Sequence, residues 1–462
     1  MKVVTVNSAA FPGMNKVIRP PLARTGEWSH LYGSADNSAF GGESLSGARK
    51  SEDMDVQWLG HPGPRNQADR NGRKPAPLAT NGRLFIQGLH RIIAIDAYNG
   101  TVLWTLGLPN FERFNMPRDC SNWCADDDHI YAAIRGRCWV INAADGRTLK
   151  QIDVVPDSRK SWAFDWGYIA SQNKLLIGSA VKKNSAYTNF WGGGSEGWYD
   201  SKKGPVNSKV CSDNLFAVQK ADGRKVWAYQ NGLVINPTIT IADGKVFFVE
   251  IRNEKTVASQ SRRVGMIEMW QDQFLVALDV STGRKIWEEA IDTPDGEVTF
   301  YMAYGGGKLV ICGSRPEGKK GHYSLDTFSA ANGGPAWQTT FEWPNEGHHG
   351  SHMSRPAIVG NLVAVRPRTF RLDTGEPLPG NMPGGGCGTY AVTEHAFLFR
   401  AGTITMWDFK GGKTSKWNRL RPDCWISTIP AGGMLLSPEG GGGCSCGNWM
   451  ETSVGFIPKL RK

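Results

Sequence analysis

AIDAYNGTVLW, which runs from Ala94 to Trp104, has close copies elsewhere in the chain. The copies are AVQKADGRKVW (Ala217 to Trp227), ALDVSTGRKIW (Ala277 to Trp287) and TFSAANGGPAW (Thr327 to Trp337). In each copy a tryptophan follows the turn glycine at the same spacing. The glycine accepts the positive φ of a tight turn between two strands, and the indole buries a large apolar area. Matches at one fixed spacing indicate an internal repeat.

Weaker copies extend the series. VINAADGRTLK, from Val140 to Lys150, keeps the turn but has a lysine at the tryptophan position. A second hairpin pattern precedes each unit, as in PTITIADGKVFFVE from Pro237 to Glu250. Two hairpins per repeat give four antiparallel strands, which is the composition of a propeller blade. The turn glycines of the series are Gly100, Gly146, Gly223, Gly283, Gly333, Gly375 and Gly412.

These turns predict seven blades, and an eighth can be assembled from both ends of the chain. Its strands would come from residues 424–437 and 453–457 and from DVQWL at residues 55–59. Closing a ring with a strand from the opposite end removes an exposed sheet edge. The sequence therefore predicts an all-β, eight-bladed β-propeller over residues 51–458, closed by an N-terminal strand. We expect residues 1–50 to form an extended or poorly ordered arm, and residues 459–462 a basic tail.

Composition narrows the possible partners. Of the 462 residues, 40% are hydrophobic, which excludes a wholly disordered chain. The net charge of +10 is spread over short basic clusters, so we expect no nucleic-acid interface. No apolar window reaches the length of a membrane helix, and MKVVTVNSAAFPGMNKV at the N-terminus lacks the apolar run of a secretory signal. We expect a monomer whose partner is a protein or a glycan.

The pattern Ala-x-Asp-x-x-Thr/Asn-Gly-x-x-x-Trp resembles the tryptophan-docking motif of the quinoprotein alcohol dehydrogenase-like propellers. That superfamily includes pyrroloquinoline quinone (PQQ) dehydrogenases and PQQ-like repeat proteins of the BamB type. The resemblance covers roughly residues 55–457 and implies a periplasmic or extracellular location. In the dehydrogenases the quinone lies against a disulfide between adjacent cysteines, beside a Ca²⁺ held by Glu, Asn and Asp. This chain has no Cys-Cys pair, so the resemblance argues against bound PQQ.

Long insertions are expected on one face of the ring, around the mouth of its channel. They span residues 181–211, 252–273, 341–353 and 437–451. Long loops on one face of a rigid fold are typical of a binding surface, although surface insertions are also simply tolerated. We therefore expect a non-catalytic PQQ-like propeller that binds a protein or a glycan through this face. Whether the chain is an enzyme stays open, since a carbohydrate-active lyase or hydrolase and a PQQ-dependent oxidoreductase are alternatives.

The enzymatic alternative depends on a histidine cluster, His348, His349 and His352. Histidine titrates near neutrality and is a common metal ligand, so this cluster could hold a divalent metal or supply a general base. Arg355 and Tyr301 are expected neighbours, and by analogy with bladed polysaccharide lyases they would take part in catalysis. A hydrogen-bonded loop without chemistry is the competing interpretation.

Two further groups of residues are expected on the same face. Four cysteines would form two disulfides, a tetrahedral metal site or free thiols; they are Cys387, Cys424, Cys444 and Cys446. Four tryptophans would stack on sugar rings or anchor the loops; they are Trp191, Trp198, Trp270 and Trp449.

Overall fold

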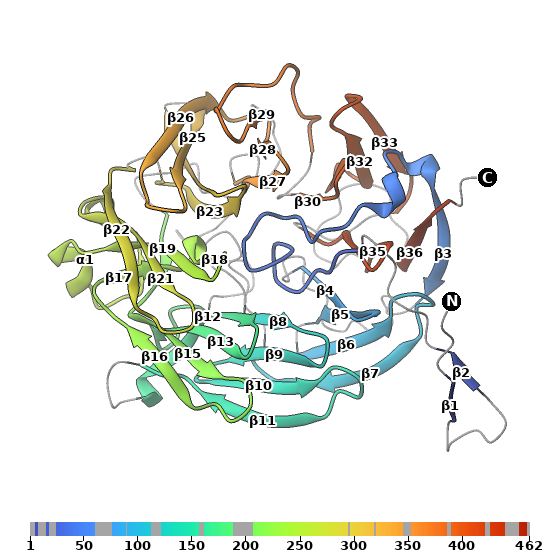
Figure 1. Ribbon diagram of the computed structural model, residues 1–462, viewed down its shortest axis with the longest axis horizontal. Helices are drawn as coiled ribbons and strands as arrows, with labels where there is room; N and C mark the ends of the chain where they lie inside the picture. Colours follow the sequence, from blue (N-terminus) through green and yellow to red (C-terminus); the bar gives the residue numbers. More distant parts are fainter. Residues whose placement is uncertain are drawn as a thin grey trace.

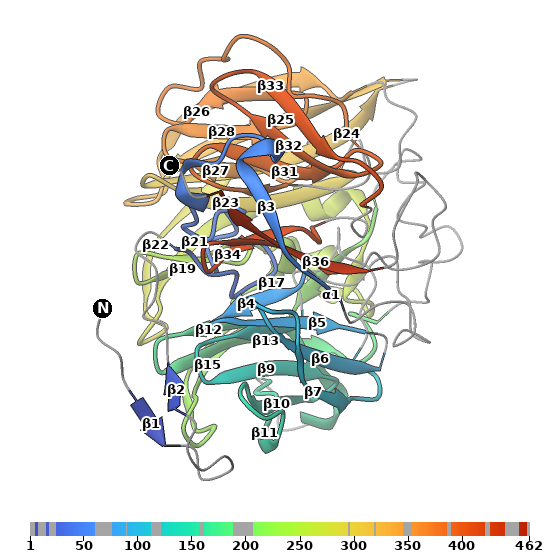
Figure 2. The same cartoon turned by 90° about the vertical axis from the view of Figure 1, so that its right-hand side faces the viewer.

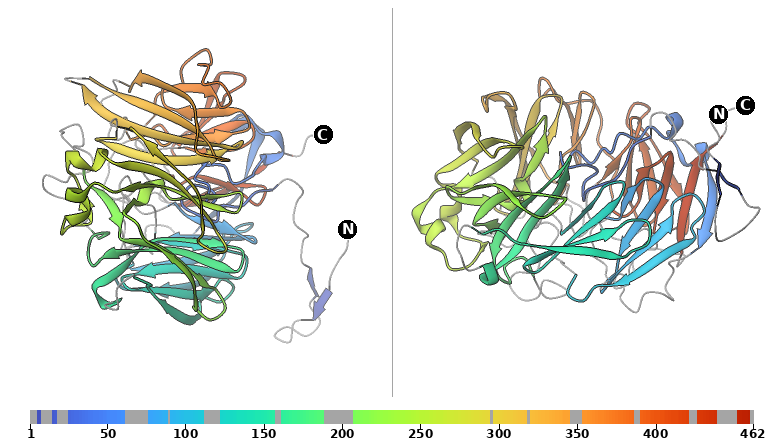
Figure 3. Two further views of the ribbon diagram at one scale, coloured as in Figure 1. Left: turned by 60° about the vertical axis from the view of Figure 1, so that its left-hand side comes forward. Right: turned by 60° about the horizontal axis from the view of Figure 1, so that its bottom comes forward.

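A computed structural model of the chain has its strands arranged in sheets around a central axis, as in a β-propeller (Figure 1). It describes residues 5–7, 15–17, 25–60, 76–88, 90–111, 122–156, 161–187, 207–293, 296–317, 320–344, 353–385, 390–420, 426–438 and 452–459. Side views show the sheets standing next to one another around the ring, with the β1–β2 hairpin apart from them (Figures 2 and 3). The fold is all-β, as the repeat predicts.

The first three sheets of the ring each contain four antiparallel strands. The first consists of β4 (Leu78–Thr80), β5 (Arg83–Gln87), β6 (Arg91–Asp96) and β7 (Val102–Gly107). The second consists of β8 (Trp123–Ala125), β9 (His129–Ile134), β10 (Arg137–Asn142) and β11 (Thr148–Asp153). The third consists of β12 (Phe164–Gln172), β13 (Leu175–Lys182), β15 (Asn214–Gln219) and β16 (Lys225–Tyr229).

The next sheet is larger, with the order β20-β14-β17-β19-β21-β22 and β18 also paired with β19. Its strands are β14 (Lys209–Ser212), β17 (Leu233–Ile235), β18 (Thr240–Ala242), β19 (Lys245–Ile251), β20 (Arg263–Val264), β21 (Gln273–Asp279) and β22 (Lys285–Ile291). It is followed by a sheet of β23 (Thr299–Gly305), β24 (Lys308–Glu317), β25 (Lys320–Ser329) and β26 (Pro335–Glu342), and by one of β27 (Ala357–Val359), β28 (Leu362–Val365) and β29 (Arg368–Arg371).

The last two sheets of the ring lead back to its beginning. One consists of β30 (Ala391–Val392), β31 (Ala396–Arg400), β32 (Ile404–Asp408) and β33 (Lys413–Trp417). The other consists of β34 (Ile429–Ala431), β35 (Met434–Ser437), β36 (Ser453–Pro458) and β3 (Met54–Gly60). β3 precedes the first sheet in the chain, yet it pairs with β36 from Met54↔Pro458 to Gly60↔Ser453.

The remaining elements are short. A two-stranded hairpin joins β1 (Thr5–Asn7) and β2 (Asn15–Val17). Among the described residues, the helices are α1 (Glu254–Ala258) and the 3₁₀ helices η1 (Leu45–Gly47), η2 (Ser51–Asp53), η5 (Ser161–Ala163), η7 (Asn236–Thr238) and η8 (Ile267–Trp270). Within the described ranges, no helix is long and apolar enough to cross a membrane.

The repeat has a direct packing explanation, because the tryptophan of one sheet lies on the turn glycine of the next. A Cβ atom at Gly146 would lie 2.6 Å from Cδ2 of Trp104, whose Nε1 donates to the carbonyl of Ala143 at 3.1 Å. The same contact joins Gly283 to Trp227. These glycines also have positive φ, so both backbone conformation and space require glycine there. Trp58 of β3 lies on Gly100 in the same way, a partner that the repeat analysis did not identify.

An N-terminal segment, residues 26–43, fills the centre of the ring (Figure 1); we refer to it as the strap. Its carbonyls accept hydrogen bonds of 2.8–2.9 Å from the main-chain N–H groups of Ala79, Ala125, Ile241, Tyr304, Ile358, Val392 and Gly432. The sequence predicts an extended or poorly ordered arm over residues 1–50; within it, residues 26–43 hydrogen-bond to the inner strands around the ring. The physical reason is that the inner strands have main-chain N–H groups facing the axis, which the strap carbonyls satisfy.

Candidate functional site

A cavity of about 830 Å³ opens where the strap passes the second and third sheets. We refer to it as the strap cavity. The strap contributes Glu27, Ser29 and His30, and the turn between β8 and β9 contributes Asp126, Asp127 and Asp128. The rest of the wall comes from β9 (His129 and Tyr131), β11 (Lys150), β12 (Ser171) and the turns that follow β12 and β15 (Lys174 and Lys220).

Asp126 shapes the turn that carries the acidic side of the cavity. β8 ends at Ala125 and β9 begins at His129, so three aspartates make the connection between two buried strands. The Asp126 carboxylate accepts the main-chain N–H groups of Asp128 at 3.1 Å and His129 at 2.8 Å. This is an aspartate turn that replaces main-chain hydrogen bonds with side-chain ones. It fixes the direction of the Asp126 side chain.

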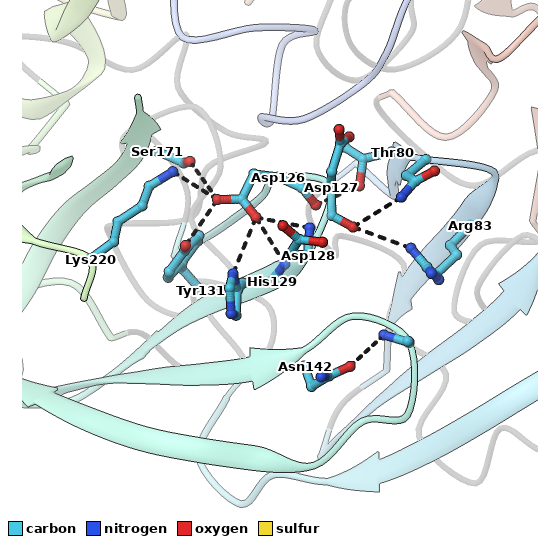
Figure 4. A network of polar contacts seen from close by, with 12 residues as sticks. Thr80, Arg83, Asp126, Asp127, Asp128, His129, Tyr131, Asn142, Ser171 and Lys220 are labelled. Atoms are coloured by element: carbon cyan, nitrogen blue, oxygen red, sulfur yellow. Dashed lines mark hydrogen bonds and ion pairs between the residues drawn. The ribbon is translucent and has the colours of Figure 1, made fainter. Parts of the chain in front are cut away.

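The second carboxylate oxygen of Asp126 forms an ion pair with a lysine and accepts a hydrogen bond from a tyrosine (Figure 4). Lys220 Nζ lies 2.7 Å from it, and the Tyr131 hydroxyl donates to it at 2.9 Å. Burial opposes ionisation of Asp126, but the Lys220 ammonium and the hydrogen-bond donors outweigh burial and lower its pKa. Lys220 Nζ also lies 5.3 Å from the centre of the Tyr131 ring. Asp126 and Lys220 therefore neutralise each other, and the lysine covers the aromatic face.

His30 lies on the strap at the inner end of the cavity and is 9% exposed. Its Nε2 accepts the main-chain N–H of Ser171 at 3.1 Å, and its Nδ1 lies 2.8 Å from the Ser29 hydroxyl. Burial, with the Lys220 charge adding to it, lowers the pKa of His30 to about 4. Because Nε2 accepts a hydrogen bond, the ring proton lies on Nδ1. The imidazole is thus neutral and both of its nitrogens are used.

Three other carboxylates line the cavity, together with two further lysines, Lys150 and Lys174. Glu27, Asp127 and Asp128 are exposed, and none forms an ion pair within the described ranges. Desolvation raises the pKa of Glu27, and the neighbouring Asp127 and Asp126 carboxylates raise it further. This acidic rim contrasts with the positive net charge of the chain. In the described part of the chain, no group of three or more His, Cys, Asp or Glu is placed to hold a metal ion.

With this geometry established, comparison with known proteins identifies the family. A family model described as outer membrane protein assembly factor BamB matches residues 161–418, over half of the chain. The chain belongs to this family of PQQ-like propellers. No curated protein matches it.

Solved structures similar to this PQQ-like propeller include enzymes and proteins without a stated reaction. A europium-containing methanol dehydrogenase is 10% identical with a TM-score of 0.54, covering 89% of this chain and 88% of its own. The computationally designed Ika8 protein is 11% identical with a TM-score of 0.50, covering 87% and 99%. BamB from Moraxella catarrhalis is 13% identical with a TM-score of 0.41, covering 73% and 80%. Identities this low show the fold alone.

Most of the site residues predicted from the sequence lie outside the described ranges of the propeller. They are His348, His349, His352, Cys387, Cys424, Cys444, Cys446, Trp191, Trp198 and Trp449. The cysteines that are described have free, buried thiols, and burial raises their pKa; they are Cys124, Cys138, Cys211 and Cys312.

Three predicted site residues are described. Arg355 and Tyr301 are brought together, with the guanidinium carbon of Arg355 4.5 Å from the centre of the Tyr301 ring. Trp270 is 7% exposed and packs edge-on against Phe300, at 5.2 Å between ring centres, with Lys209 Nζ 4.9 Å from its ring. Its indole therefore anchors η8 within the protein interior.

Sequence reasoning missed the strap cavity altogether. The one usable signal was the acidic run Asp126-Asp127-Asp128 followed by His129 between two apolar strands. Nothing in the sequence links that run to His30 or Lys220, since these residues meet only through the ring.

Proposed function

We propose that this PQQ-like propeller, eight-bladed and closed by β3, is a non-catalytic binding protein whose partner is another protein. A basic side chain of the partner would enter the strap cavity. The observation that supports this most is the acidic rim, where Glu27, Asp127 and Asp128 lie beside a pair, Asp126 and Lys220, that is already neutral.

The electrostatics of the rim favour a cationic ligand. The raised pKa of Glu27 means that its ionised form is disfavoured by desolvation and by neighbouring carboxylates. A lysine or arginine side chain placed among these groups would offset that repulsion, and a guanidinium can bind a carboxylate with two hydrogen bonds. Charge complementarity of this kind gives specificity and speeds association.

The polar groups of the cavity support binding rather than catalysis. His30 uses both ring nitrogens, Lys220 is paired with Asp126, and burial raises the pKa of the nearby Cys124 thiol. Among the described residues of the cavity, no nucleophile is hydrogen-bonded to a free base. A glycan is less well supported, because Lys220 covers the ring of Tyr131, on which a sugar would stack.

The loop-rich face remains a second predicted surface for a protein or glycan. Of its insertions, residues 252–273 are described, whereas residues 188–206, 345–352 and 439–451 lie outside the described ranges. The carbohydrate-active alternative remains a prediction because His348, His349 and His352 lie outside the described ranges. The PQQ-dependent alternative also remains a prediction.

Titration calorimetry with a hexa-arginine peptide, and with hexa-citrulline as the uncharged control, tests the proposal. We expect the wild type to bind the arginine peptide and not the citrulline one. The double variant E27Q/D127N should weaken binding about tenfold or more, since it removes two charges from the rim. D373N, an exposed aspartate on a turn of another sheet, should leave binding unchanged. Equal binding by E27Q/D127N, or dye reduction by the purified chain supplied with PQQ and Ca²⁺, would overturn the proposal.

A further inference from the structure

Arg355 is a buried cation that has no counter-ion among the described residues. It lies two residues before β27 and is 2% exposed. Its guanidinium carbon is 3.8 Å from the ring centre of Tyr32 in the strap and 4.5 Å from that of Tyr301 in β23. Within the described ranges, its Nε and Nη1 are buried and have no hydrogen-bond acceptor, and no carboxylate forms an ion pair with it.

A second buried arginine, Arg262, has the charged and polar partners that Arg355 lacks among the described residues. Arg262 is also buried, at 6% exposed. Its Nη2 lies 2.7 Å and its Nε 2.8 Å from Asp213, and its Nη1 donates to the Ser259 carbonyl at 2.6 Å. A buried charge ordinarily has partners of this kind, because removing it from water without them is costly. Two aromatic rings stabilise the Arg355 charge but accept none of its in-plane N–H groups.

Neighbouring groups among the described residues add hydroxyls but no carboxylate that pairs with Arg355. The Ser354 hydroxyl is buried and, within the described part of the chain, also has no hydrogen-bond partner. Burial raises the pKa of Tyr301 well above its ordinary value, so its hydroxyl stays protonated and able to donate. Three groups that can donate hydrogen bonds thus occur where β23 and β27 meet the strap: a guanidinium, a serine hydroxyl and a phenol hydroxyl.

We propose that Arg355 and Tyr301 form a binding site for the carboxylate of a small molecule. The carboxylate supplies the missing negative charge and the in-plane acceptors, and its planar shape matches the guanidinium that the two rings hold flat. Arg355 comes just before its inner strand, whereas Asp126 comes just after its own. The site is therefore at the other end of the inner strands from the strap cavity, and it does not depend on the proposed protein partner.

Thermal unfolding of the full chain at constant ionic strength tests this site. Acetate, benzoate and citrate are compared with chloride, sulfate and phosphate. We expect at least one carboxylate at saturation to raise the Tm of the wild type by about 3 °C or more. R355M should abolish the shift, and R262M, the matched buried arginine, should preserve it. Equal shifts with sulfate or phosphate, or a carboxylate shift that persists in R355M, would overturn the proposal.

The unliganded variants give an independent readout. R355M should unfold at the wild-type temperature or above it, because it removes an unpaired buried charge. R262M should unfold at a lower temperature, because it leaves Asp213 buried and unpaired. If R355M destabilises the chain as R262M does, Arg355 has a structural partner and the inference is wrong. Saturation-transfer NMR with benzoate and wild-type protein detects contact with the ligand even if a variant does not fold.

Discussion

His30 is held neutral in an environment that excludes its charged form. Its pKa of about 4 lies below the ordinary value of 6.5, so between these two values the unfolded chain binds a proton that the folded chain does not. Its contribution to stability is complete above pH 6.5 and is lost as the pH falls toward 4. We therefore predict that the free energy of unfolding decreases by roughly 1.4 kcal/mol per pH unit in this window because of His30 alone.

Urea unfolding at pH 7 and pH 5 measures this effect. H30Q keeps a hydrogen-bond acceptor for the Ser171 N–H but cannot take up the proton, so its stability should depend less on pH. H90Q, at an exposed histidine, should keep the wild-type pH dependence. The interpretation of His30 fails if H30Q and the wild type lose stability equally on acidification.

At the scale of elements, the contact between a turn glycine and the preceding tryptophan holds neighbouring sheets together. Gly283 and Gly244 both have a φ of +70°. A Cβ at Gly283 would lie 2.6 Å from Trp227, whereas among the described residues no atom would lie within 4 Å of a Cβ at Gly244. We predict that G283A lowers the free energy of unfolding by about 1–3 kcal/mol more than G244A does.

Comparing the two variants separates the cost of the backbone conformation from the cost of the clash with the indole, which a single variant would combine. Both alanines adopt the same unfavourable backbone conformation, so their difference in denaturant unfolding reports the clash with the indole alone. Equal destabilisation by G283A and G244A would mean that the tryptophan moves without cost, and that the docking contact does not join the sheets.

At the scale of the whole molecule, Glu43 fastens the strap to the last sheet. Its buried carboxylate accepts the N–H groups of Gly26, Ser44, Leu45 and Gly433 at 2.8–3.1 Å. E43A would leave these donors without a partner, so we predict a loss of unfolding free energy on the order of 4 kcal/mol. E52A, at an exposed glutamate in η2, should have little effect. Guanidinium unfolding followed by tryptophan fluorescence measures both, and a small effect of E43A would show that the strap is weakly bound.

The fold was predictable because its signal is local. The spacing from Gly223 to Trp227 is written within a few residues, and it reports a packing contact that every good copy repeats. The candidate site was not predictable because its signal is long-range. Asp126 and Lys220 are 94 positions apart, and the strap that completes the cavity has no periodicity. It binds through main-chain carbonyls, which any sequence could provide.

The hydrogen bonds of the strap also determine when, relative to the sheets, this segment can complete its folding. It precedes the sheets in the chain, yet its carbonyls need N–H groups from Ala79 through Gly432. A ribosome would release these residues long before most of the donor N–H groups exist. The segment therefore cannot complete its hydrogen bonds until nearly the entire polypeptide has emerged, so the earliest part of this propeller to be made is among the last to reach its final position.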